Sequence, residues 1–297
     1  MARRRPPSHP CRILALMPAV LSRSRPVARR PESTFSLLIR AGLALTTMML
    51  PAPALAGSAL PRGFVYLRDI DPTIVQDIRY AGSHNFVGRP IRGYLAAECI
   101  LSVSAANALE TVQRMLADKK LSLIVWDCYR PKRAVGDFLQ WSKDPTHSET
   151  KSEFYPRTDK EKLFALGYLA RRSSHSRGST VDLGIVPASF LSAPPPNPPQ
   201  SPGACTAAKG ERFEDGTIDF GTGYDCLDVL ANTSNALVGG MARHNRQTLR
   251  SYMKGAGFRP YAREWWHFEH IDEPFRDGFD FEVSAPPSSN ERPARQH

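Results

Sequence analysis

The stretch RRSSHSRGSTVDLGIV, residues 171–186, constrains the fold more than any other part of the chain. It joins a histidine, a turn of small residues and an apolar run that contains an aspartate. Small residues and glycine favour a tight turn, and the apolar run TVDLGIV predicts a buried strand. If the segment SRGST folds back, this strand presents Asp182 beside His175. We therefore interpret His175 and Asp182 as candidate metal ligands; a surface turn without metal is the alternative.

Catalytic zinc usually has three protein ligands and an open position for water, so a third ligand must come from elsewhere. The best candidate is His267 in REWWHFEH, because Glu264 lies three residues before it as a candidate general base. His270 competes with it as a ligand, and a structural His267 within an aromatic cluster is a further alternative. Residues three apart in a regular strand point to opposite faces. Glu264 and His267 can therefore share a site only if a bulge or tight turn occurs at Trp265 and Trp266.

The apolar patterns predict one α+β domain, residues 57–281, with a small, mostly antiparallel sheet, helices packed against it and the metal site at the sheet. Ser104 is expected to cap the first long helix, and Pro131 to lie in the first turn of the second. The prolines of residues 187–203 indicate an exposed loop, and the composition of residues 282–297 indicates a disordered tail. The expected elements are two short strands within 63–80, helices at 104–120, 128–144, 158–172 and about 237–255, strands at 121–127 and 180–186, and a strand-like segment at 257–270.

The positive charge of the chain is concentrated at its start. Residues 1–56 hold nine arginines and one glutamate, and so contribute +8 of the formal net charge of +10. They end in an apolar segment too short to span a bilayer, followed by small residues at Ala54 and Ala56. This pattern predicts a signal peptide with a long basic n-region, cleaved after Ala56, and a periplasmic protein; an uncleaved anchor and a later start at Met17 are alternatives. The near-neutral remainder argues against a nucleic-acid partner and against stable membrane insertion after cleavage.

The cysteines favour an oxidising compartment. Without Cys11, the mature chain keeps an even set of Cys99, Cys128, Cys205 and Cys226. Such a set favours two disulfides in an exported protein, although four reduced, buried thiols are the alternative. Of the three pairings we prefer Cys99 with Cys128 and Cys205 with Cys226, because each pair closes a short loop beside a motif described here. No CxxC spacing is present, so a zinc site built from these cysteines is not expected.

Four motifs occur in a characteristic order: DCYRP, SSHSRGSTVD, FGTGYD and EWWH. In this order they resemble the D-alanyl-D-alanine dipeptidases, a branch of the zinc D,D-peptidases in the M15 group. The similarity runs from about Phe64 to Phe268 and includes IRYAGSHNFVG near its start. Two positions of the FGTGYD motif depart from the family, where Phe220 replaces methionine and Tyr224 replaces phenylalanine. We expect both swaps to matter little, because all four side chains are large and mainly apolar; the proline-rich insertion could reshape the rim of the pocket.

The resemblance implies a residue set for each part of the reaction. His175, Asp182 and His267 would ligate one zinc ion per chain, and Glu264 would act as catalytic base and acid. Arg130 would stabilise the oxyanion, with a structural salt bridge as the alternative role. Substrate binding would involve Ser173, two residues before the first ligand, and Asp225, which would bind the ammonium group of the substrate.

The function implied is zinc-dependent hydrolysis of D-Ala-D-Ala to free D-alanine, in salvage or remodelling of cell-wall peptides. Its partner would be a small D,D-dipeptide. A zinc D,D-carboxypeptidase that trims peptidoglycan stem peptides is the alternative enzyme, and a wall-binding module without catalysis is the alternative outside enzymes. Asp225 favours the dipeptidase, because an ammonium-binding carboxylate selects for a free amino terminus.

Overall fold

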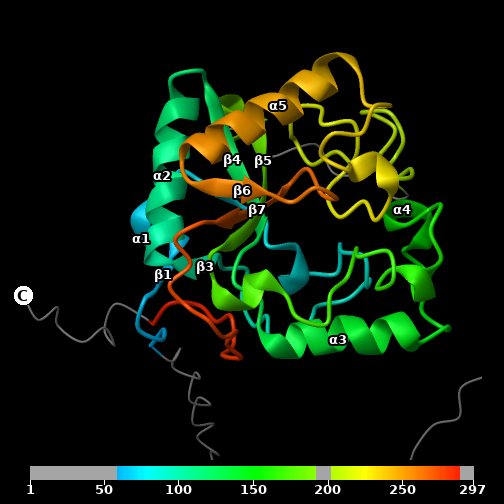
Figure 1. Ribbon diagram of the computed structural model, residues 1–297, viewed down its shortest axis with the longest axis horizontal. Helices are drawn as coiled ribbons and strands as arrows, with labels where there is room; N and C mark the ends of the chain where they lie inside the picture. The colour runs from blue at the N-terminus through cyan, green and yellow to red at the C-terminus, as the bar shows by residue number, and fades with distance from the viewer. Residues whose placement is uncertain (1–58, 192–201, 288–297) are drawn as a thin grey trace, which may run out of the picture. The chain divides into compact units, whose positions relative to one another are not determined.

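The computed structural model describes residues 59–191 and 202–287, and its folded part combines short strands with a few helices (Figure 1). The strands are β1 (Phe64–Tyr66), β2 (Val75–Gln76), β3 (Ile100–Ser102), β4 (Leu121–Asp127), β5 (Thr180–Pro187), β6 (Phe258–Pro260) and β7 (His267–His270). The α-helices are α1 (Leu67–Ile70), α2 (Val103–Ala117), α3 (Lys132–Lys143), α4 (Lys151–Phe154) and α5 (Gly240–Gly255). Short 3₁₀ turns occur at Arg79–Ala81, Lys160–Lys162, Ser174–Arg177, Ala188–Leu191 and Val229–Ala231.

The main sheet has the strand order β2-β4-β5-β7-β6, and only its β2–β4 pair is parallel. A separate antiparallel pair joins β1 and β3. The residues of β4 after Leu121 are all buried, as are those of β5 before Pro187, which explains why both strands are apolar almost throughout. The prediction of an α+β domain with a small, mostly antiparallel sheet is confirmed.

Helices cover the sheet from several sides. Figure 1 shows α5 above the sheet, α2 beside it and α3 below it. In α2 the apolar residues Ala105, Leu109, Val112 and Leu116 recur at helical spacing and are fully buried, which fixes this face against the core. The expected cap at Ser104 is wrong: the Ser102 hydroxyl accepts the hydrogen bond from Ala105 N, because the helix begins one residue before Ser104.

The two short strands expected within 63–80 are present as β1 and β2, with the short helix α1 between them. The expectation of a helix at 158–172 is wrong, because that segment contains only the 3₁₀ turn Lys160–Lys162. Gly167 has φ +79°, a left-handed conformation that ends helical geometry and favours glycine. The chain turns there, so that Leu163 and Leu169 reach the core without an intervening helix.

The ends of the predicted domain are only partly within the described residues. The signal peptide of residues 1–56 lies outside them, as do residues 192–201 of the proline-rich loop and residues 288–297 of the tail. The packed chain continues past Phe281, because Val283 is buried and pairs with Tyr94. Between residues 59 and 191 and between 202 and 287, no helix is both long enough and apolar enough to cross a membrane.

Both preferred disulfides are formed, Cys99–Cys128 and Cys205–Cys226. The first joins the start of β3 to the residue after β4, and the second ties the loop after residue 203 to the FGTGYD motif. Each bond therefore anchors a segment that leads into the region around His175, Asp182 and Asp225.

Removal of the second disulfide by Cys205→Ala with Cys226→Ala should lower the free energy of unfolding by about 3 kcal/mol. The expected size follows from the loss of loop closure in the unfolded chain, for the sequence separation of 21 residues. Urea unfolding followed by tryptophan fluorescence measures it, with the reduced wild-type protein as a reference. A variant as stable as the oxidised wild type would contradict a structural role for this bond.

Candidate active site

Three side chains from separate segments meet at the sheet. His175 comes from the turn Ser174–Arg177, Asp182 from β5 and His267 from the first position of β7. His175 Nε2 lies 3.2 Å from His267 Nδ1 and 3.3 Å from Asp182 Oδ1. His267 Nδ1 lies 3.0 Å from the same Asp182 oxygen. The predicted ligand atoms therefore point at one common position.

The local fold explains this convergence. Asp182 is directly opposite His267 in the antiparallel β5–β7 pair, so their side chains emerge on the same face. The turn that precedes β5 ends at Gly178, whose φ is +95°. A Cβ added there would lie 2.3 Å from the Phe64 ring, so only glycine fits. This tight turn returns the chain to the sheet and places His175 beside Asp182.

The chemistry of the three groups fits a metal ion. Asp182 Oδ1 is buried and makes no well-directed hydrogen bond within the described residues, and the atoms nearest to it are two imidazole nitrogens that can be metal ligands. His175 Nδ1 donates to the Cys128 carbonyl at 2.8 Å, and this bond leaves the Nε2 lone pair free for a metal. Although burial raises the pKa of Asp182, the charges of His175 and His267 lower it well below its usual range. The three residues can therefore hold a divalent cation with two nitrogen ligands and one oxygen ligand.

Glu264 lies beside this cluster, with Oε2 3.5 Å from His267 Nδ1. The chain between the two residues turns at Trp265 and Trp266, and His267 N donates to the Glu264 carbonyl at 3.4 Å. The predicted turn is therefore present, and both side chains face one site. Burial, together with the Asp182 charge, raises the pKa of Glu264 to about 8. A carboxyl group with such a pKa can both take up and release a proton near neutral pH.

Arg130 lies at the end of β4, where the strand passes into α3. Its Nε and its terminal nitrogen are each 2.8 Å from Asp127 Oδ2, and the guanidinium lies over the Tyr80 and Phe138 rings. It also approaches Asp182 Oδ2 at 3.6 Å. Arg130 is therefore a fixed positive charge next to the ligand cluster.

Asp225 lies across the same cavity. Its φ of +54° is uncommon for a residue other than glycine, and its carboxylate accepts a hydrogen bond of 2.8 Å from Tyr80. Burial and the Asp182 charge raise its pKa well above the usual range. No ion pair to Asp225 occurs among the described residues, so a cationic group could bind there and restore its charge.

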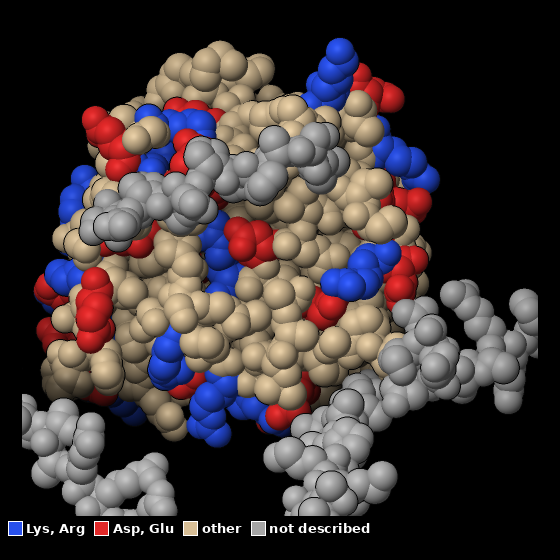
Figure 2. Space-filling model, turned by 180° about the vertical axis from the view of Figure 1, so that it is seen from behind, with Lys and Arg blue, Asp and Glu red and all other residues tan. Residues whose placement is uncertain are grey.

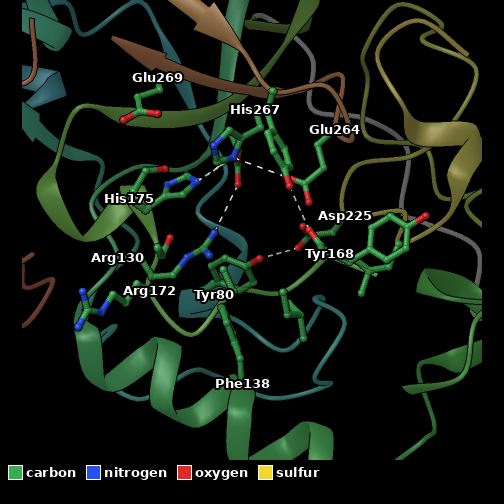
Figure 3. A pocket seen from close by; sticks show the side chains of 18 of the residues that line it. Tyr80, Arg130, Phe138, Tyr168, Arg172, His175, Asp225, Glu264, His267 and Glu269 are labelled. Carbon is green, nitrogen blue, oxygen red and sulfur yellow. Dashed lines mark hydrogen bonds and ion pairs between the residues drawn. The ribbon is translucent and has the colours of Figure 1, made fainter. Parts of the chain in front are cut away.

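These residues line one cavity of about 520 Å³, to which Ser173 also contributes. Figure 3 shows His175, His267, Glu264, Arg130 and Asp225 directed toward its centre. The cavity is of the size expected for a small ligand. His270, the competing candidate ligand, is buried on the other side of β7 against Phe258 and does not reach the site.

Aromatic packing joins the two loops that carry Glu264 and Asp225. Trp265 stacks on Phe220 with ring centroids 4.1 Å apart, and its indole nitrogen donates to Thr222 Oγ1 at 2.8 Å. Tyr224, one of the two departures from the family motif, donates a hydrogen bond from its hydroxyl to Asp182 Oδ2 at 3.2 Å. This chain therefore has a hydrogen bond to Asp182 that phenylalanine could not make.

Two further residues of the site were missed from the sequence. Asp127 is fully buried and contacts both Arg130 and His175, the latter with 3.3 Å between Oδ2 and Nδ1. Tyr80 connects the cavity to Asp225. Both could have been suspected from the sequence, because Asp127 lies in DCYRP and Tyr80 in IRYAGSHNFVG, two motifs that carry the family resemblance.

Comparison with known proteins identifies the family of this chain. The family model for D-ala-D-ala dipeptidases, Peptidase M15, matches residues 61–190 and 198–284. A D-alanyl-D-alanine dipeptidase of Enterococcus faecalis is 34% identical over 226 residues, which cover 76% of this chain and 100% of that protein. The dipeptidase of Enterococcus faecium is 32% identical over 223 residues, 74% of this chain and 98% of the relative. One from Streptomyces coelicolor is 34% identical over 222 residues, with the same coverage. The chain therefore belongs to peptidase family M15, the D-Ala-D-Ala dipeptidases.

Proposed function

We propose that this protein hydrolyses D-Ala-D-Ala to free D-alanine, with one zinc ion held by His175, Asp182 and His267. The observation that carries the proposal is the convergence of three candidate ligand atoms, His175 Nε2, His267 Nδ1 and the buried Asp182 Oδ1, which lie 3.0 to 3.3 Å from one another. The names of the relatives support the same reaction. A wall-binding module without catalysis would not need a base and an arginine beside the ligands.

Each residue then has a distinct task. A zinc ion held by His175, Asp182 and His267 would supply Lewis acidity, which would polarise the scissile carbonyl and lower the pKa of a nearby water toward about 7. Glu264 is positioned to accept the proton of that water and to return it to the leaving amine. Arg130 holds positive charge where negative charge develops on the carbonyl oxygen, and Asp127 keeps its guanidinium in place. Ser173 borders the same cavity and would contact the substrate.

The buried Asp225 favours a dipeptide over a longer peptide. An ammonium group beside this carboxylate would gain a charged hydrogen bond in a site largely closed to water. An acylated amino terminus has no such charge and would leave the carboxylate without a partner. The same zinc chemistry on a stem peptide, the carboxypeptidase alternative, would not use Asp225.

The compartment is also part of the proposal. The predicted signal peptide, with cleavage after Ala56, would place the enzyme in the periplasm beside peptidoglycan, where two disulfides can form. There the reaction would serve salvage or remodelling of wall peptides.

Variants of the ligands and of the base should behave differently. His175→Ala, Asp182→Ala and His267→Ala should lose both zinc and activity, because each removes one of three ligands. Glu264→Gln should keep zinc but lose about 10²- to 10⁴-fold in kcat, the usual contribution of a general base. Metal analysis after dialysis, together with initial rates, separates the two groups. Full zinc occupancy in Asp182→Ala would remove that residue from the ligand set.

Loss of the Tyr224 hydroxyl should weaken the metal site without emptying it. Tyr224→Phe removes the hydrogen bond to Asp182 Oδ2 while the ring can keep its stacking on Trp126. Partners that orient a metal ligand typically contribute about 10- to 100-fold in affinity. Competition with a fluorescent zinc chelator measures the change, and Phe220→Met, on the same loop, is the control. Equal zinc affinity of Tyr224→Phe and wild type would show that the hydroxyl has no such role.

Blocking the substrate amino group tests the dipeptidase directly. N-acetyl-D-Ala-D-Ala should be cleaved at least tenfold more slowly than the free dipeptide, judged by kcat/KM. A charge left buried without its partner costs about 2–5 kcal/mol, or roughly 30- to several-thousand-fold. Asp225→Asn should reduce the difference in kcat/KM between the free and the acetylated dipeptide, because it slows cleavage of the free dipeptide most. Equal rates on free and acetylated substrates would favour the carboxypeptidase instead.

A further inference from the structure

A second cavity, of about 570 Å³, adjoins the candidate active site. It lies between α3, the segment that leads to His175, and residues 276–278. Arg172, Ser173 and Arg177 line both cavities, so the two share one wall. In Figure 3 the Arg172 side chain points away from His175 and His267.

The lining of this second cavity is strongly cationic. Lys132, Arg171, Arg172 and Arg276 are exposed and border it, whereas Asp277 is its acidic lining residue. In the described part of the chain, none of these four cations forms an ion pair with a carboxylate. The cavity therefore carries excess positive charge, whereas residues 57–297 as a whole have a formal net charge of only +2.

Arginines just outside this group are neutralised. Arg133, next to Lys132 on α3, lies 3.1 Å from Asp280 and 2.9 Å from Glu282. Arg177, on the shared wall, pairs with Glu269 and Glu273. Like charges gathered around one hollow repel one another and attract an anion. This cavity thus gathers four cations without a paired carboxylate around one concave surface, next to arginines whose charges are balanced.

The remaining lining residues indicate the kind of anion. Ser176 is only 4% exposed, and its hydroxyl is buried without a hydrogen-bond partner. Val135 and Leu139 of α3 add apolar surface. Guanidinium groups bind carboxylates through bidentate hydrogen bonds. The apolar side chains of the cavity wall favour a ligand with a carbon chain over an inorganic anion.

We propose that this cavity is a second binding site, separate from the metal site, for a small organic carboxylate. Its ligand would bind between Arg171, Arg172 and Arg276, at the wall shared with the catalytic cavity. The assignment does not depend on the proposed hydrolysis, because binding is measurable without turnover.

The test is calorimetric titration of the zinc-loaded protein at low ionic strength with glutarate and, separately, with sulfate. Wild type should bind glutarate saturably and more tightly than sulfate. Arg171→Ala with Arg276→Ala should bind glutarate at least about tenfold more weakly, since one charged hydrogen bond contributes about 1.5–3 kcal/mol. The matched control is Lys119→Ala with Lys143→Ala, which removes the same charge from exposed positions outside the cavity and should bind as wild type does.

Three results would overturn the proposal. One is the absence of saturable glutarate binding to wild type. Another is wild-type affinity in Arg171→Ala with Arg276→Ala, which would place the ligand elsewhere, for example at the metal. Tighter binding of sulfate than of glutarate would rule out a site for an organic acid. Unchanged D-Ala-D-Ala turnover in both double variants would show that they remain folded, because none of the four residues lines the catalytic cavity.

Discussion

The site depends on one row of the sheet, in which Asp127 of β4, Asp182 of β5 and His267 of β7 lie side by side. A slip of one residue in either pairing would turn Asp182 away from its neighbours, because successive side chains on a strand alternate between faces. The bulge between Val125 and Asp127 places Asp127 opposite Asp182 and so adds it to this row. The buried apolar residues of β4 and β5 hold this register, so the core itself sets the positions of Asp127, Asp182 and His267 relative to one another.

Segments outside the sheet are fastened to this row by polar contacts as well as by packing. The Cys128 carbonyl orients the His175 ring, and the Cys99–Cys128 bond secures that carbonyl. Buried Arg246 of α5 donates to the carbonyls of Phe220, Leu230 and Asn232, and so supports the loop that presents Asp225. A site assembled from several separate segments can therefore be rigid, which catalysis by fixed charges requires.

The charges around the cavity are unevenly distributed. Burial raises the pKa of both Asp225 and Glu264, while the histidines lower that of Asp182. The three carboxyl groups of this small cavity thus have different environments. That of Asp225 suits a cationic ligand, that of Glu264 suits proton transfer, and that of Asp182 suits a metal ion. Figure 2 shows acidic and basic side chains interspersed over the face opposite to that of Figure 1.

The sequence by itself determined the elements that depend on local pattern: the buried strands β4 and β5, the two disulfide pairs and the residues His175, Asp182, His267 and Glu264, which it proposed for one site. The prediction of a helix at residues 158–172 failed. The apolar spacing there suits a helix, but the left-handed Gly167 and the burial of Leu163 and Leu169 produce turns instead. The sequence also missed Asp127 and did not anticipate the hydrogen bond of the Tyr224 hydroxyl. Their roles arise from hydrogen bonds to Arg130 and Asp182, and such partners are known only when distant strands and loops meet. The tertiary structure alone decided these contacts, because register and burial, not spacing along the chain, set which polar atoms face one another.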